Sequence, residues 1–158
     1  MSLADVVQAL QLDLVFRIVL GFVLGGALGL EREWRDKPAG LRTHMLVGGG
    51  AAMYTVASYA LWGNFDVPRD PARIAAQVVV GVGFLGGGAI LRSGLSVVGI
   101  TTAATIWVAA AVGMLAGGGG YPLAIAGTLM SVLVLRLPAR FFVPGNPRRL
   151  DEPPDESD

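Results

Sequence analysis

Long uncharged segments alternate with short charged ones along this chain. Residues 18–30, 45–65 and 74–91 contain no Asp, Glu, Lys or Arg, and residues 93–135 form one continuous uncharged stretch. A helix needs about 20 apolar residues to cross the roughly 30 Å hydrocarbon core of a bilayer. A helix of a soluble protein would instead keep a charged face toward water. The pattern therefore predicts membrane-spanning helices.

The longest uncharged stretch is too long for one span. Glycines at positions 117–120, followed by Tyr121 and Pro122, interrupt it. The resulting prediction is an all-α, polytopic membrane protein in which residues 1–143 form one transmembrane domain. Its five expected transmembrane helices lie near residues 12–30, 44–62, 73–91, 100–116 and 121–137. Residues 144–158 are acidic and rich in proline, which predicts a disordered tail.

Composition agrees with a lipid environment. Hydrophobic residues make up 53% of the 158 residues and charged residues 15%, whereas soluble domains carry about 25% charged residues. The net charge is zero, which leaves no basic footprint for nucleic acid. The absence of cysteine excludes a disulfide framework and a thiol nucleophile. The lipid bilayer is thus the expected partner, and no cofactor is expected.

Lysine and arginine are concentrated in alternate connections between the predicted spans. One side of the membrane would carry Arg32, Arg35, Lys37, Arg42, Arg92, Arg136, Arg140, Arg148 and Arg149. The opposite side would carry only Arg69 and Arg73. Because cytoplasmic loops are enriched in Lys and Arg, we expect the N-terminus outside and the C-terminus in the cytoplasm. This orientation requires an odd number of spans, such as five.

Small residues recur every four positions in two predicted spans: Gly21, Gly25 and Gly29 in the first, and Ala109, Gly113 and Gly117 in the fourth. This spacing places them on one helical face, where small side chains let helix backbones approach closely in lipid. Two interpretations remain open. The faces pack within the bundle, or they mediate a homodimer or another homo-oligomer.

A glycine-rich segment in the third predicted span matches a nucleotide-binding pattern. Residues 81–86, which include Gly83 and Gly86, read GxGxxG, but the chain has no Asp or Glu between Asp70 and Asp151 to bind a ribose. A nucleotide fold is therefore not expected, and these glycines are assigned to helix packing. The triplet formed by Gly86, Gly87 and residue 88 weakens a helix, which suggests a hinge or an unwound segment lining a polar cavity.

Charged residues cluster after the first span. Glu31 follows the apolar run directly, and at that depth it should be paired, with Arg42 or Arg92 as candidate partners. Arg32 belongs to the same cluster. His44, the only histidine, begins the second span and is a candidate pH sensor or a buried structural residue. A Mg²⁺ site at Glu31 is an alternative, although the surrounding arginines disfavour it.

Four further polar residues of the predicted spans are candidates for a functional site: Gln77 in the third, and Thr101, Thr102 and Thr105 in the fourth. One interpretation gathers Gln77, Thr102 and Thr105 around a polar pocket. In the other, Thr101 caps its helix and the hydroxyls bond to backbone carbonyls.

Several long motifs resemble the MgtC/SapB family of bacterial inner-membrane proteins. They are residues 29–33, 37–47, 70–77, 81–88 and 99–107. The resemblance implies a five-helix transmembrane domain, which in longer members precedes a cytoplasmic regulatory-type domain. Because this chain continues into the acidic tail, that second domain is expected to be absent.

The resemblance also implies a function. Family members are associated with growth in low magnesium and with survival of intracellular pathogens, and at least one is similar in role to an inhibitory subunit that binds the membrane sector of the rotary ATP synthase. The first hypothesis is therefore a regulatory membrane protein that acts through helix–helix contacts. The alternative is a small oligomeric channel or transporter for Mg²⁺ or protons. The predicted spans contain no plausible nucleophile–base pair, so an enzyme is not expected.

Overall fold

The computed structural model describes residues 11–60, 70, 72–93 and 96–137. Its five helices are α2 (Leu12–Glu33), α3 (Leu41–Ala60), α4 (Ala72–Gly88), α5 (Ile100–Gly117) and α6 (Tyr121–Arg136). Each predicted span is a helix whose ends lie within three residues of the predicted ends. The all-α prediction is therefore confirmed. The tail, and residues 138–143 of the predicted domain, lie outside the described residues.

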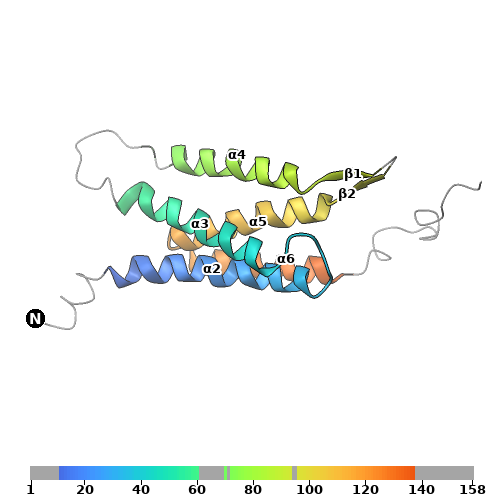
Figure 1. Ribbon diagram of the computed structural model, residues 1–158. Helices are drawn as coiled ribbons and strands as arrows, with labels where there is room; N and C mark the ends of the chain where they lie inside the picture. The colour runs from blue at the N-terminus through green and yellow to red at the C-terminus, as the bar shows by residue number, and fades with distance from the viewer. Residues whose placement is uncertain (1–10, 61–69, 71, 94–95, 138–158) are drawn as a thin grey trace, which may run out of the picture.

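A short β-hairpin follows α4, which the sequence pattern does not predict. Strands β1 (Leu91–Ser93) and β2 (Ser96–Val98) pair antiparallel, with Leu91 opposite Val98 and Ser93 opposite Ser96. The chain then enters α5 through Gly99, whose φ of 92° is a left-handed conformation that glycine adopts without a steric penalty. The hairpin extends beyond the ends of the helices (Figure 1).

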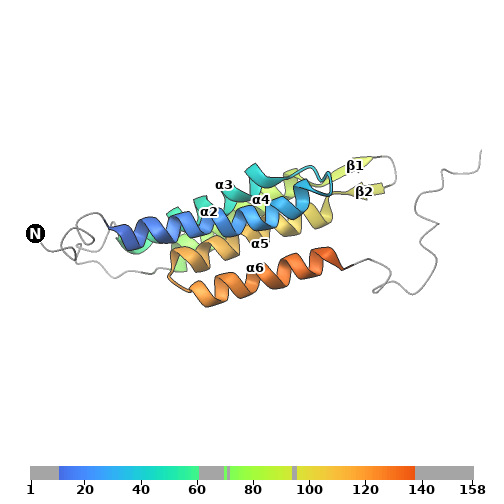
Figure 2. The same cartoon turned by 90° about the horizontal axis from the view of Figure 1, so that it is seen from below.

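The helices form a bundle in which successive helices run in opposite directions (Figures 1 and 2). Helix α5 is central and contacts each of the other four helices. The α2–α3 loop, the hairpin and the C-terminal end of α6 lie together at one end of the bundle (Figure 1). We call this the charged end, because Glu31, Arg32, Arg35, Arg42 and Arg136 lie there.

The outer surface of the bundle is apolar. Helices α2 and α5 are long and apolar enough to cross a membrane by length and composition, and α4 and α6 are shorter apolar helices. Helix α6 exposes Leu123, Leu129, Met130 and Leu133, each more than 60% accessible. A row of large aliphatic side chains facing outward suits lipid contact and would be unfavourable in water.

Glycines bring α2, α3 and α5 together. A Cβ placed on Gly113 would collide with the Gly48 carbonyl oxygen of α3, and one on Gly117 would lie 2.6 Å from the Ala52 oxygen. On α2, a Cβ at Gly21 would lie 2.6 Å from the Ala52 side chain, and one at Gly25 would collide with the His44 carbonyl oxygen. These four glycines therefore pack within the bundle, the first of the two interpretations.

The glycines of α4 behave differently. Gly86 is buried, and a Cβ there would lie 3.5 Å from the Ala103 oxygen of α5. At Gly83 and Gly87, a Cβ would meet nothing within 4 Å. Packing of Gly83 and Gly87 against a neighbour therefore stays a prediction, because their face of α4 points away from the other described helices.

The prediction of an unwound glycine segment inside α4 is corrected. The helix continues through Gly86 and Gly87 and ends at Gly88, just before the turn into β1. The triplet thus forms the last turn of α4, where loss of helix propensity is least harmful because the final carbonyls have no helical partners.

Candidate functional site

Two charged side chains, Glu31 and Arg32, are buried at the charged end, each with 4% of its surface exposed. Arg32 places Nε and Nη2 at 2.6 Å from Glu31 Oε2, and Arg35 Nε lies 2.7 Å from Glu31 Oε1. Burying a carboxylate without partners is strongly unfavourable. Arg32 donates a hydrogen bond to Oε2, and Arg35 forms an ion pair with Oε1 that lacks hydrogen-bond geometry. The charge of Glu31 is therefore compensated locally, although Oε1 accepts no hydrogen bond from the described residues.

The predicted pairing of Glu31 is confirmed, and its described partners are Arg32 and Arg35. Arg35 is four residues beyond Glu31, a spacing that brings side chains together over a helix end. Arg42 is exposed. The backbone of Arg92 lies in β1, and its side chain is outside the described part of the chain.

A cation site at Glu31 is disfavoured by this geometry, because arginine nitrogens occupy the positions that metal-bound waters would need. Within residues 11–60, 70, 72–93 and 96–137, no group of three or more His, Cys, Asp or Glu side chains is placed to hold a metal ion.

His44 is fully buried where α2, α3 and α5 meet. Its Nδ1 lies 2.9 Å from the Gly40 carbonyl oxygen, and its Nε2 lies 3.0 Å from Thr105 Oγ1 of α5. Thr105 Oγ1 is in turn 2.8 Å from the Thr102 carbonyl oxygen. The glycine face of α2 makes room for the ring, since a Cβ on Gly29 would lie 2.9 Å from His44 Cβ. The histidine and two threonines therefore form one buried polar network.

Two of the three residues predicted to surround a polar pocket are buried in the network of His44, and neither of them lines a described cavity. Thr102 and Thr105 are buried, at 3% and 5% exposure, but Gln77 is exposed and lines a cavity between α3 and α4. The third polar side chain beside Thr102 and Thr105 is His44 and not Gln77. Thr101 is exposed and does not cap α5, because Gly99 is the N-cap residue and Thr101 already lies within the helix.

Two contacts at the ends of the bundle were not predicted. Glu33 Oε2 accepts a hydrogen bond from the Leu41 amide at 2.8 Å, which caps the first turn of α3. At the opposite end, Asp13 pairs with Arg17 at 2.6 Å and accepts a hydrogen bond from the Tyr121 hydroxyl at 3.1 Å. The i, i+4 spacing of Asp13 and Arg17 is a usable sequence signal, whereas the link to Tyr121 spans 108 residues.

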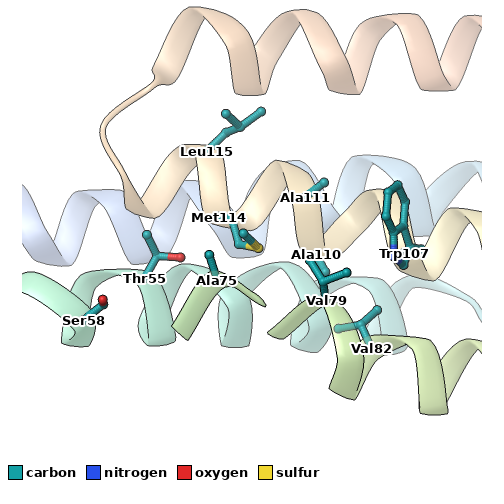
Figure 3. Close-up of a pocket in the computed structure, with 10 residues that line it drawn as sticks. All are labelled: Thr55, Ser58, Ala75, Val79, Val82, Trp107, Ala110, Ala111, Met114 and Leu115. Carbon is teal, nitrogen blue, oxygen red and sulfur yellow. The ribbon is translucent and has the colours of Figure 1, made fainter. Parts of the chain in front are cut away.

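Two apolar cavities flank α4. The α3–α4 groove has a volume of about 680 Å³ and is lined by residues including Gly50, Tyr54, Gln77 and Gly81. The α4–α5 cavity has a volume of about 440 Å³ and lies between α4 and helices α3 and α5 (Figure 3). Val82, one of only two buried residues of α4, lines both. Helix α4 is therefore held to the bundle along a narrow strip.

Comparison with known proteins identifies relatives over most of the chain. The model of the MgtC family matches residues 18–141. The chain is 48% identical over 131 residues to the "Putative magnesium transporter YhiD" of Escherichia coli K12, covering 79% of this chain and 60% of that protein. It is 42% identical over 123 residues to "Protein MgtC" of Salmonella typhimurium, covering 78% of this chain and 51% of that protein.

A cyanobacterial relative is equally similar. The chain is 48% identical over 126 residues to the "Uncharacterized protein slr0014" of Synechocystis, covering 80% of this chain and 52% of that protein. The chain thus spans between half and three fifths of the length of these curated relatives. No solved structure matches it. Because the family model matches residues 18–141, which include Glu31 and His44, this protein belongs to the MgtC family.

Proposed function

We propose that this protein is a regulatory protein of the bacterial inner membrane, which acts through lateral helix–helix contacts with membrane partners. The observation that carries the proposal is the outward face of α4. Gly83 and Gly87 form a GxxxG unit there with no described neighbour, and Phe84 beside them is 85% exposed. In lipid, such a face favours docking of another helix, because small residues allow close backbone contact.

The other peripheral helix has a different outer surface. Helix α6 also buries only two residues, Ala124 and Thr128, but it exposes mainly Leu, Met and Val side chains that lipid tails can cover. Helix α4 also exposes large apolar side chains, among them Val80, Phe84 and Leu85. Between them lie glycines whose Cβ would meet nothing, and the polar side chain of Gln77 lies in the adjoining α3–α4 groove. This contrast supports α4 as the docking face and α6 as a lipid-facing helix.

In this proposal the five helices span the membrane with the charged end in the cytoplasm. The positive-inside rule supports that orientation, since Arg32, Arg35, Lys37 and Arg42 lie in or beside one connection at this end. The partner is a second copy of the chain or another membrane protein. The family resemblance makes the membrane sector of the rotary ATP synthase a candidate partner and suggests a role in adaptation to low magnesium or to virulence-type stress. The relative named a putative magnesium transporter supports the link to magnesium.

Replacement of a single glycine tests the docking face. Gly83→Leu places a bulky side chain where a Cβ meets nothing, so the bundle should fold while close approach of a partner helix is blocked. Ala126→Leu on the exposed surface of α6 is the matched control. We expect Gly83→Leu to lose co-purification of a differently tagged copy or of a membrane partner, and Ala126→Leu to retain it. Full association of Gly83→Leu would contradict the proposal.

Ion transport is the second candidate, because a relative with 48% identity is named a putative magnesium transporter. A transporter would need an ion path, which Gln77 in the α3–α4 groove could line in an oligomer. Purified protein in liposomes would be assayed for Mg²⁺ and proton flux. Flux that is lost in Gln77→Leu would favour the transporter, and flux equal to that of empty liposomes would favour the regulator.

A further inference from the structure

We propose that His44, Thr105 and the Thr102 carbonyl form a proton-binding site inside the bundle, which holds the histidine in either protonation state without displacement of a helix. This site goes beyond the regulatory function proposed above and does not depend on it. Three hydrogen bonds carry the proposal: Nδ1 of His44 with the Gly40 carbonyl, Nε2 of His44 with Thr105 Oγ1, and Thr105 Oγ1 with the Thr102 carbonyl. Each bond needs one hydrogen atom, and their number differs between the neutral and the charged ring.

The contact of Nδ1 fixes one proton on the ring. The Gly40 carbonyl oxygen, 2.9 Å from Nδ1, can only accept a hydrogen bond, so Nδ1 must donate. In the neutral ring, Nε2 then carries a lone pair and must accept from Thr105 Oγ1 at 3.0 Å. The neutral state therefore uses the single hydroxyl hydrogen of Thr105 for the histidine.

The charged ring reverses this second contact. When a proton from water adds to the Nε2 lone pair, Nε2 donates to Thr105 Oγ1, and the hydroxyl hydrogen must point elsewhere. The Thr102 carbonyl oxygen, 2.8 Å from Thr105 Oγ1, accepts it. A rotation about the C–O bond of Thr105 thus converts one hydrogen-bonded arrangement into the other. In the neutral state the Thr102 carbonyl keeps the regular helix bond from the amide four residues on.

Among the residues whose side chains the structure describes, few charges lie near the ring. Arg32 of α2 is the described cation that acts on His44, and it is paired with Glu31. Arg35 also pairs with Glu31, and the Glu33 carboxylate caps Leu41 at the start of α3. Arg42 on the same helix as His44 is exposed. Helix α5, which supplies both threonines, contains no ionisable side chain between Ile100 and Gly117.

His44 lies near the charged end of the bundle although its side chain is buried. His44 is the fourth residue of α3, and Thr102 is the third residue of α5, so both are about one helical turn, roughly 5 Å, from the charged end. A proton can therefore reach the ring through opening of a single turn.

The single histidine of the chain makes the site directly measurable. Protein with ¹⁵N-labelled histidine, purified in detergent with a tag that contains no histidine, would give one pair of ring-nitrogen signals. We expect the neutral ring to carry its proton on Nδ1, and acidification to add a proton to Nε2 while the helical circular dichroism is retained. A neutral ring protonated on Nε2, or a ring that stays neutral until the helices unfold, would overturn the proposal.

Variants of Thr105 test the role of the hydroxyl. Thr105→Val removes both the donor to the neutral ring and the acceptor of the charged ring. Because a hydrogen bond to a charged group is the stronger of the two, proton affinity should fall about tenfold. Thr105→Ser keeps the hydroxyl and should titrate like the parent protein. Thr128→Val is the matched control, because that buried hydroxyl bonds only to the Ala124 oxygen of its own helix at 2.9 Å. Equal titration of Thr105→Val and the parent would also overturn the proposal.

Discussion

At the residue scale, Glu31 and Glu33 lie two positions apart but have different surroundings. Glu31 is buried between Arg32 and Arg35, whereas Glu33 is exposed and accepts one hydrogen bond from the Leu41 amide. Both contacts stabilise the charged end. The two contacts differ in the group that would lose its partner if the carboxylate were removed. Without Glu31, the Arg32 guanidinium would stay buried and unpaired, whereas without Glu33 the Leu41 amide could bond to solvent.

This difference gives a prediction for stability. Glu31→Ala leaves the buried Arg32 without its partner, a loss of about 3–5 kcal/mol. Glu33→Ala removes a capping interaction, a loss of about 1 kcal/mol. Thermal unfolding in detergent should therefore show a markedly lower melting temperature for Glu31→Ala than for Glu33→Ala. Equal melting temperatures would refute the structural role assigned to the Glu31 pairs.

At the element scale, two glycines in the interiors of helices have different neighbours. Gly113 of α5 faces the backbone of α3 so closely that a Cβ would collide with the Gly48 oxygen, while Gly83 of α4 faces open space. Gly113 therefore serves the packing of the bundle. Gly83 remains available for a contact with another molecule.

Alanine substitutions at these two positions should have opposite effects. Gly113→Ala forces α3 and α5 apart, and destabilisation of about 1–3 kcal/mol is expected for an overpacked contact. Gly83→Ala meets no neighbour and should stabilise α4 by up to about 1 kcal/mol through helix propensity. Unfolding of both variants in the same detergent measures the difference. A destabilised Gly83→Ala would indicate that its face of α4 is packed within the monomer.

The helices follow from the sequence more fully than the site does. Apolar runs of hydrocarbon length and the break at residues 117–120 locate all five helices, because these are local properties of the chain. The hairpin is missed since its strands have only three residues each. The contact between His44 and Thr105 joins residues 61 positions apart, and no local pattern specifies which helix faces the ring. The same limit explains why Gln77 is wrongly placed in the pocket.

At the scale of the whole molecule, the alternating direction of the helices gives the bundle two unlike ends. One end carries the buried Glu31–Arg32 pair and the exposed basic residues Lys37 and Arg42. The opposite end carries the α5–α6 turn, closed by Gly119 with φ of 82° and followed by Pro122. Because the outer surface between these ends is apolar, we expect a bilayer to surround the bundle. Because basic residues are concentrated at the charged end, we expect that end to face the cytoplasm.

Labelling of single cysteines tests the orientation of the bundle in the membrane, because the chain has no cysteine of its own. Lys37→Cys and Pro122→Cys place one thiol at each end, both at exposed positions. In intact spheroplasts, a membrane-impermeant maleimide should label Pro122→Cys and should reach Lys37→Cys only after permeabilisation. Labelling of both variants from outside, or recovery of the protein from the soluble fraction without detergent, would contradict the account.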